Sequence, residues 1–107
     1  MTVKEALQLA NALRPNDLEE ATLVALLWGL EEQLATEVRG EGRTPRAVIC
    51  TDLEVPAPFD RVYWTYLMAM IDLASGSTER YRISDALYRE SREAYARWHQ
   101  RTAGQGA

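Results

Sequence analysis

The sequence predicts an all-α protein: a small four- to five-helix bundle with a long loop or short hairpin between the second and third helices. Apolar residues recur at spacings of three and four along most of the chain, which is the period of an amphipathic helix. Capping and breaking residues separate four such stretches. At 107 residues, with 47% apolar and 26% charged residues, the chain is long enough for one hydrophobic core.

The first two helices are predicted from their start and stop signals. Thr2 and Glu5 form a capping-box pattern, which predicts a helix over residues 3–14. Pro15 then disfavours helical geometry at the residue before it. Acidic residues follow at once, where the dipole of a new helix favours negative charge, and this predicts a second helix over residues 17–39.

The second and third helices are unusually apolar. Residues 23–30 are apolar around nearly the whole circumference, and Gly29 there indicates either a close backbone approach or simple tolerance of glycine. The third helix is predicted over residues 58–75 and is expected to be the most buried, because Thr65 and Asp72 are the only polar residues between Val62 and Ala74. Two such helices predict apolar surface that meets another copy of the chain.

A segment without helical period, residues 40–57, separates these two helices. Its β-prone centre includes Val48 and Ile49, which favours equally a lone strand or hairpin and a loop pinned to the core. Connections of this length are either functional or disordered. We therefore expect the segment to be mobile in the isolated protein and to become ordered against a neighbour.

The fourth helix is predicted over residues 78–101. Tyrosines repeat at intervals of seven, which places an apolar stripe on one face and mixed charges on the others. Residues 1–102 are therefore expected to form one helical domain, and residues 103–107 a flexible tail. The predicted core comprises Leu27, Trp28, Tyr66, Leu67, Met70, Tyr81, Tyr88, Tyr95 and Trp98.

Composition limits the compartment and the ligands. The single cysteine, Cys50, excludes an intrachain disulfide, no secretory signal opens the chain, and no apolar stretch approaches membrane-spanning length, so a cytoplasmic protein is expected. Residues 1–60 carry a net charge of −6 and residues 61–107 carry +2. This polarity argues against specific nucleic-acid binding and is compatible with head-to-tail contact between charged surfaces, although a solvated surface would look the same.

The sequence contains no pattern typical of an enzyme, a cofactor site or a metal site. His99, the only histidine, is interpreted as a solvated residue of the last helix. Asp52, Glu54 and Asp60 are the only acids that could converge, and they are better explained by loop solubility and helix capping than by acid/base chemistry. Candidate interface residues are Arg82, Arg89, Arg92, Arg97, Val48 and Ile49.

Several motifs resemble the head-tail connector, or adaptor, proteins of long-tailed bacteriophages and prophages. The proline-flanked stretch 53–60 is the most specific of them, and 12–16 also fits, whereas Ser77 and Arg82 depart from the pattern. The other matching positions are Tyr63, Tyr66, Leu67, Ala69 to Asp72, Ala74, Gly76, Arg80, Tyr81, Tyr95, Ala96, Trp98 and Arg101.

This resemblance implies a non-enzymatic virion protein that takes part in assembly in the host cytoplasm and then resides in the virion neck. Its expected partners are further copies in a ring, the portal protein and the next connector or tail-completion protein, with DNA passing through the ring. No cofactor and no membrane are implied. The alternatives are a cytoplasmic helical adaptor that binds a partner protein helix, and a small enzyme that uses the acids near residue 52.

Overall fold

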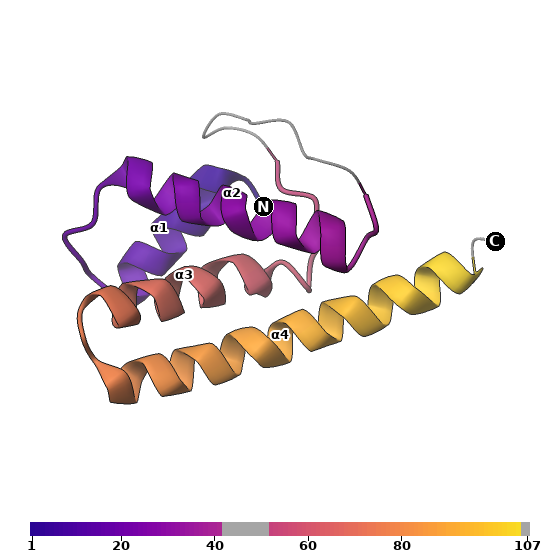
Figure 1. Cartoon of the computed structure of the whole chain (residues 1–107). Coiled ribbons are helices and arrows are strands. Elements are labelled where there is room, and N and C mark those ends of the chain that lie inside the picture. Colours follow the sequence, from indigo (N-terminus) through magenta and orange to yellow (C-terminus); the bar gives the residue numbers. More distant parts are fainter. Residues whose placement is uncertain (42–51, 106–107) are drawn as a thin grey trace.

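The computed structural model describes residues 1–41 and 52–105 and confirms the all-α prediction (Figure 1). Four α-helices make up the described part of the chain, and none of its residues forms an extended strand. The helices are α1 (Val3–Leu13), α2 (Glu20–Glu37), α3 (Arg61–Ala74) and α4 (Thr78–Gln105).

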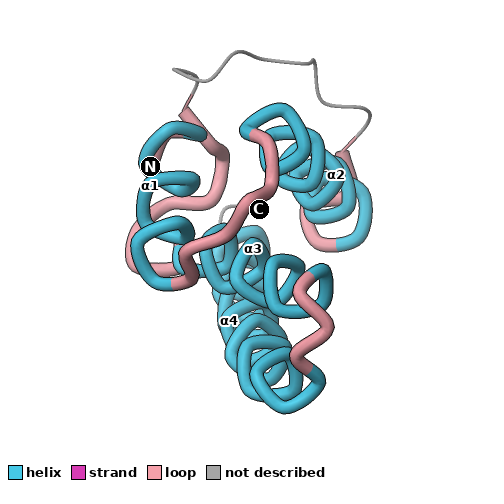
Figure 2. Tube along the Cα trace, turned by 90° about the vertical axis from the view of Figure 1, so that its left-hand side faces the viewer, coloured by secondary structure: helices cyan, strands magenta, loops and turns pink. Residues whose placement is uncertain are grey.

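Helix α3 lies at the centre of the bundle, as its apolar sequence predicted. Figure 2 shows α1 and α2 side by side on one side of α3, and α4 on the other. Eight of the 14 residues of α3 are buried, because it alone contacts all three other helices. Helix α4 packs on α3 only, so most of its circumference has no helical neighbour within the described residues.

Helix α1 runs parallel to α3, and polar contacts join the two helices at both ends. At the start, the N-terminal ammonium group pairs with Asp60 at 3.7 Å, and the Leu53 N–H donates to the Met1 carbonyl at 2.9 Å. At the end, Arg14 pairs with Asp72 at 3.0 Å. The capping box at Thr2 is present as predicted.

The end of the long connection is ordered, which corrects the expectation that all of residues 40–57 are mobile. Asp52 forms an isolated antiparallel bridge with Thr2, and Leu53 and Val55 are buried in the core. Burial of these two side chains fixes the chain before α3 begins. The β-prone residues Val48 and Ile49 lie outside the described residues.

Helix boundaries differ from the prediction for local reasons. Helix α2 begins at Glu20 rather than residue 17, because the Asn16 side chain accepts a hydrogen bond from the Leu18 N–H and so holds a non-helical turn. Helix α3 begins at Arg61 rather than 58, after a turn in which the Phe59 N–H donates to the Pro56 carbonyl.

Helix α4 continues to Gln105, four residues beyond the predicted end at residue 101. Once a helix is established, each further residue adds a hydrogen bond at little additional entropic cost, and Ala103 is a strong helix former. The prediction ended the helix earlier because residues 102–105 carry no apolar pattern, and the flexibility of the end of the chain stays a prediction.

The predicted core residues fall into two groups. Leu27, Leu67 and Tyr95 are fully buried, whereas the remaining six are only half-buried. The half-buried residues of α3 and α4 lie at the edges of the contact between the two helices, where only one side of the side chain is covered. The half-buried residues are Trp28, Tyr66, Met70, Tyr81, Tyr88 and Trp98.

Helix α2 does face solvent, contrary to the expectation from its apolar sequence. Its outer face consists of small and polar residues, among them Thr22, Ala25 and Gly29, and a Cβ added at Gly29 would meet nothing within 4 Å. Within the described residues there is thus no close backbone approach. The exposed large apolar side chains lie elsewhere, on α1, α3 and α4.

Replacing Gly29 by alanine is therefore expected to stabilise the purified protein by about 1 kcal/mol, because alanine has the higher helix propensity and the added methyl group contacts nothing. Urea unfolding followed by circular dichroism measures the change. A loss of stability would indicate that another part of the chain does approach Gly29.

Candidate functional site

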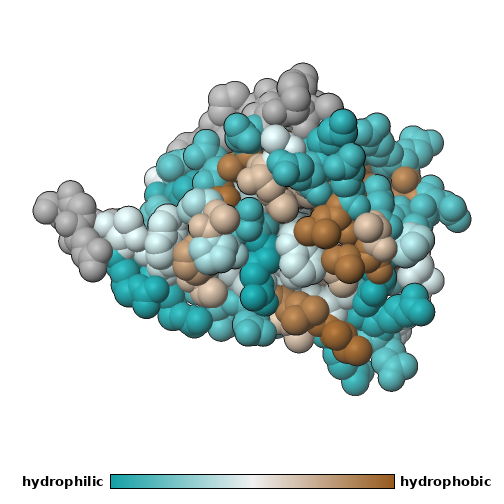
Figure 3. Space-filling view, turned by 180° about the vertical axis from the view of Figure 1, so that it is seen from behind, coloured by the Kyte–Doolittle hydropathy of each residue, from teal (hydrophilic) through white to brown (hydrophobic). Residues whose placement is uncertain are grey.

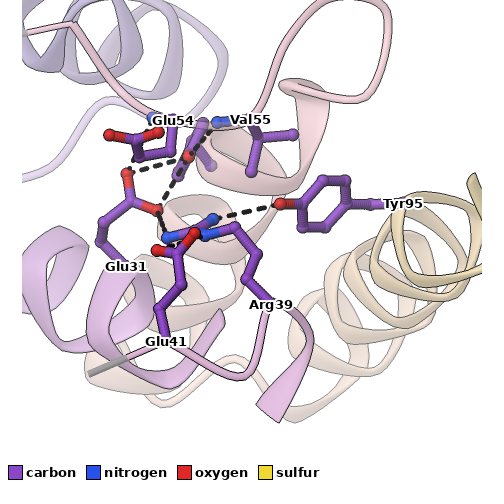
Figure 4. A network of polar contacts seen from close by, with 7 residues as sticks. Glu31, Arg39, Glu41, Glu54, Val55 and Tyr95 are labelled. Atoms are coloured by element: carbon purple, nitrogen blue, oxygen red, sulfur yellow. Dashed lines mark hydrogen bonds and ion pairs between the residues drawn. The ribbon is translucent and has the colours of Figure 1, made fainter. Parts of the chain in front are cut away.

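A carboxylate is buried at the centre of the fold. Glu31 of α2 is only 1% exposed, and its oxygens accept hydrogen bonds from the Tyr63 hydroxyl at 2.9 and 3.1 Å and from the Glu54 N–H at 3.1 Å. Figure 4 shows this group between α2 and the segment that leads into α3. The carboxylate thus links α2, α3 and the ordered end of the connection.

Arg39 supplies the counter-charge. Its guanidinium lies 3.2 Å from Glu31 and donates to the Tyr95 hydroxyl of α4 at 3.1 Å, and it also pairs with Glu41 (Figure 4). Burial alone lowers the pKa of Arg39, but the hydrogen bond to Tyr95 and the charge of Glu31 raise it above its ordinary value. Arg39 therefore stays charged and joins α2 to α4.

Tyr63 completes this cluster as a hydrogen-bond relay between the backbone and Glu31. The Val55 N–H donates to its hydroxyl at 2.9 Å, while the hydroxyl donates to Glu31. Burial and the nearby negative charge raise the pKa of Tyr63 well above its usual range. All these polar groups have partners, and such satisfied networks are typical of a structural role.

A second buried cluster lies where α1, α3 and α4 meet. Asp72 of α3 is buried, accepts from the Ser84 hydroxyl of α4 at 2.5 Å and pairs with Arg14 at 3.0 Å. Its carbonyl also accepts from the Ser77 N–H at 3.1 Å, which holds the turn before α4. Asp72 therefore determines how the ends of three helices are placed.

Replacing Asp72 by alanine is expected to destabilise the protein by about 3 kcal/mol, because Ser84 loses its buried acceptor and Arg14 its counter-charge. Thermal and urea unfolding measure the change. The matched control is Asp85→Ala, which removes a pair between a half-buried acid and the exposed Arg89 and should change stability by only about 0.5 kcal/mol. Equal effects of both substitutions would contradict the assigned role.

The predicted interface arginines do not form one surface. Arg82, Arg89 and Arg97 are exposed on α4, with Arg89 and Arg97 paired to acids one turn earlier. Arg92 is instead half-buried and pairs with Glu37 of α2. Arg92 is therefore part of a contact within the protein, because α4 turns this side toward α2. Val48 and Ile49 lie outside the described residues.

An open groove of about 600 Å³ lies between α2 and α4. Its lining includes the half-buried rings of Tyr66 and Tyr88, whose centroids are 5.1 Å apart, and burial raises the pKa of both hydroxyls. Arg92 and Glu37, which pair with each other, both line this groove. The charged residues of the lining carry both signs, so the groove selects neither anions nor cations.

The acids considered for catalysis are not assembled into a buried site. The side chains of Asp52 and Glu54 are exposed, and Asp60 pairs with the N-terminal ammonium. His99 is half-buried beside Tyr95 rather than solvated, with ring centroids 6.1 Å apart. Among the described residues no group of three His, Cys, Asp or Glu side chains is placed to hold a metal ion.

Sequence analysis missed the roles of Glu31 and Asp72. For Glu31 the sequence did contain a signal. Glu31 shares a helix face with Leu27 and Leu34, which are four residues before it and three after it. An acid at such a core position requires a buried partner. Which partner it finds depends on residues far along the chain, and this the periodicity does not indicate.

These features define the chain as a small all-α domain whose helices are joined by two buried polar clusters. No helix in the described part of the chain combines the length and hydropathy needed to cross a membrane. Comparison with protein-family models, with curated proteins and with solved structures found no match.

Proposed function

We propose that this chain is a non-enzymatic assembly protein of the bacteriophage head-tail connector kind, which joins the portal to the tail as a ring of copies. The observation that carries the proposal is α4, a helix of 28 residues whose backbone packs on α3 alone among the described helices. Side chains also link it to Glu37 of α2 and to Arg39, but its outer surface, with Arg82, Arg89 and Arg97, is exposed. Support also comes from the connector-like motif 53–60, which leads into the central helix.

Fully satisfied polar clusters favour this function over catalysis. Glu31 and Asp72 each pair with an arginine and accept further hydrogen bonds. These contacts hold helices together, which is a structural role. A rigid bundle with a large exposed helix suits a protein that presents surfaces to neighbours. Portal and tail-completion proteins are the proposed partners, and the virion neck is the proposed location.

Deletion of the gene from the phage or prophage that carries it tests the proposal. Filled heads and separate tails are the expected products, with tailed particles restored by the intact gene supplied in trans. A copy with an early stop codon is the matched control. Normal tailed particles after deletion, or absence of the chain from purified virions by mass spectrometry, would contradict the proposal.

A helical adaptor that binds a partner helix is the second candidate, and the groove between α2 and α4 favours it. The groove is open, and the rings of Tyr66 and Tyr88 lie in it among charged residues of both signs, which suits an amphipathic partner helix. Deletion separates the two candidates, because loss of an adaptor would leave the particles intact.

A further inference from the structure

The large exposed apolar side chains of the described residues gather at one end of the bundle. They are Leu9 (37% exposed), Leu13 (43%), Leu73 (55%) and Ile83 (58%). Leu9 and Leu13 share a face of α1, while Leu73 and Ile83 flank the turn between α3 and α4. Figure 3 shows brown, hydrophobic residues concentrated on the half of the molecule that holds this turn.

The buried Asp72 cluster holds these apolar residues in place. Leu13 precedes Arg14, Leu73 follows Asp72 and Ile83 precedes Ser84 in the chain, and Arg14 and Ser84 each bond to Asp72. Leu13, Leu73 and Ile83 are therefore each the immediate neighbour of a residue of this cluster, and Leu9 lies one helical turn before Leu13 on α1. A surface held in this way is preorganised, which lowers the entropic cost of binding.

The exposed apolar and charged residues at this end of the molecule form two corners of opposite charge. The α1–α2 corner comprises Leu9, Leu13, Asp17, Glu19 and Glu20, and its three acids are exposed. The α3–α4 corner comprises Leu73, Arg80, Arg82 and Ile83, and both its arginines are exposed.

The longer stretches of chain that contain the corners differ in charge in the same sense. Between Arg14 and Arg39 the chain carries six acids and no base, whereas α4 carries six arginines against four acids. Several of these charges are paired away from the corners, among them Glu31 with Arg39 and Glu37 with Arg92. The charge difference at the corners themselves is therefore that of their exposed acids and arginines. Glu79 beside the second corner is the one acid in the first turn of α4.

The arginines at the α3–α4 corner are unfavourable for the isolated helix. A helix N-terminus repels cations, yet Arg80 and Arg82 lie within the first five residues of α4. No ion pair within the described residues involves either of them, and their positive charge matches the acids of the other corner. The two corners lie on opposite edges of the same end of the molecule, at the start of α2 and the start of α4 (Figure 1).

We infer that the α3–α4 corner of one copy binds the α1–α2 corner of a second copy, head to tail. Apolar residues meet at the centre of this contact and arginines meet acids around it. Contacts between two different surfaces of identical chains generate rings or open filaments. The pairing depends on the proposed function for its biological setting, but the purified full-length protein suffices to test it.

Sedimentation velocity over a range of concentrations and salt provides the test. The intact protein is expected to self-associate, more weakly at high salt. Arg80→Glu with Arg82→Glu should weaken association at least about tenfold, as should Asp17→Lys with Glu19→Lys, because like charges then face each other. The arginine substitutions also favour the dipole of α4, so unfolding would not explain their effect.

Mixing the two doubly substituted proteins should restore association, since each then offers a corner complementary to the other. Arg97→Glu with Arg101→Glu, at the far end of α4, is the matched control and should leave association unchanged. The inference is overturned if the intact protein stays monomeric at all concentrations, if the control weakens association equally, or if the mixture does not associate.

The sedimentation and gene-deletion experiments together distinguish the inferred corner contact from the proposed connector function. Self-association through the corners by a chain that is absent from virions would leave the inference standing and contradict the connector function. A chain that is needed for tail attachment but associates through other surfaces would support the connector function and contradict the corner contact.

Discussion

Replacing Arg39 by methionine is expected to lower the free energy of unfolding by about 3–5 kcal/mol. Glu31 would then keep a buried negative charge without its counter-charge, and the Tyr95 hydroxyl would lose its donor. Urea unfolding at neutral pH, followed by circular dichroism, measures the loss.

The matched control combines Arg39→Met with Glu31→Leu. Removing both charges leaves apolar side chains of similar volume, so this protein should recover much of the lost stability. The Glu54 N–H and the Tyr63 hydroxyl lose their acceptor in it, which limits the recovery. A double variant that is less stable than Arg39→Met alone would contradict the view that Arg39 stabilises the protein mainly as the counter-charge of Glu31.

Replacing Tyr95 by alanine is expected to cost about 3–5 kcal/mol, the range for a buried aromatic side chain. Tyr95 is the fully buried member of the α4 stripe, lies with its ring centroid 6.0 Å from that of Trp98 and accepts the Arg39 hydrogen bond. Thermal unfolding and urea titration both report this change.

Two matched variants separate the contributions of packing and hydrogen bonding. Tyr95→Phe removes the hydroxyl alone and should cost about 1.5 kcal/mol, the lower value for a hydrogen bond to a charged group. Trp98→Ala should cost less than Tyr95→Ala, because Trp98 is half-buried although it stacks on Phe59 at 5.2 Å. The assignment fails if Trp98→Ala proves the more damaging of the two.

Under the proposed contact, stability and assembly would depend on different residues of α4. Tyr95, Ser84 and Ser91 face α3 and are buried, while Arg82 and Ile83 face solvent. Substitutions in the first group should reduce folding, and substitutions in the second should change contacts between chains. The separation is possible because α4 is covered along one side only.

The surplus apolar surface expected from the sequence exists, but most of it lies on other elements than expected. It was expected on the second and third helices, whereas α3 is covered by its neighbours and α2 exposes small residues such as Ala25 and Gly29. The exposed leucines and isoleucine lie on α1, at the end of α3 and on α4. Apolar content alone does not show which helices find partners, because that depends on their order in space.

Local sequence signals predicted the all-α fold, the capping box at Thr2 and the burial of α3, and they limited the number of helices to four or five. These are local properties: periodicity, capping residues and an apolar run act within a few residues of one another. Tertiary structure alone decided that Glu31 meets Arg39 and Tyr63, and that Asp72 joins Arg14 to Ser84. Those partners are brought together by helix packing, and a buried charge is tolerated only where the packing supplies them.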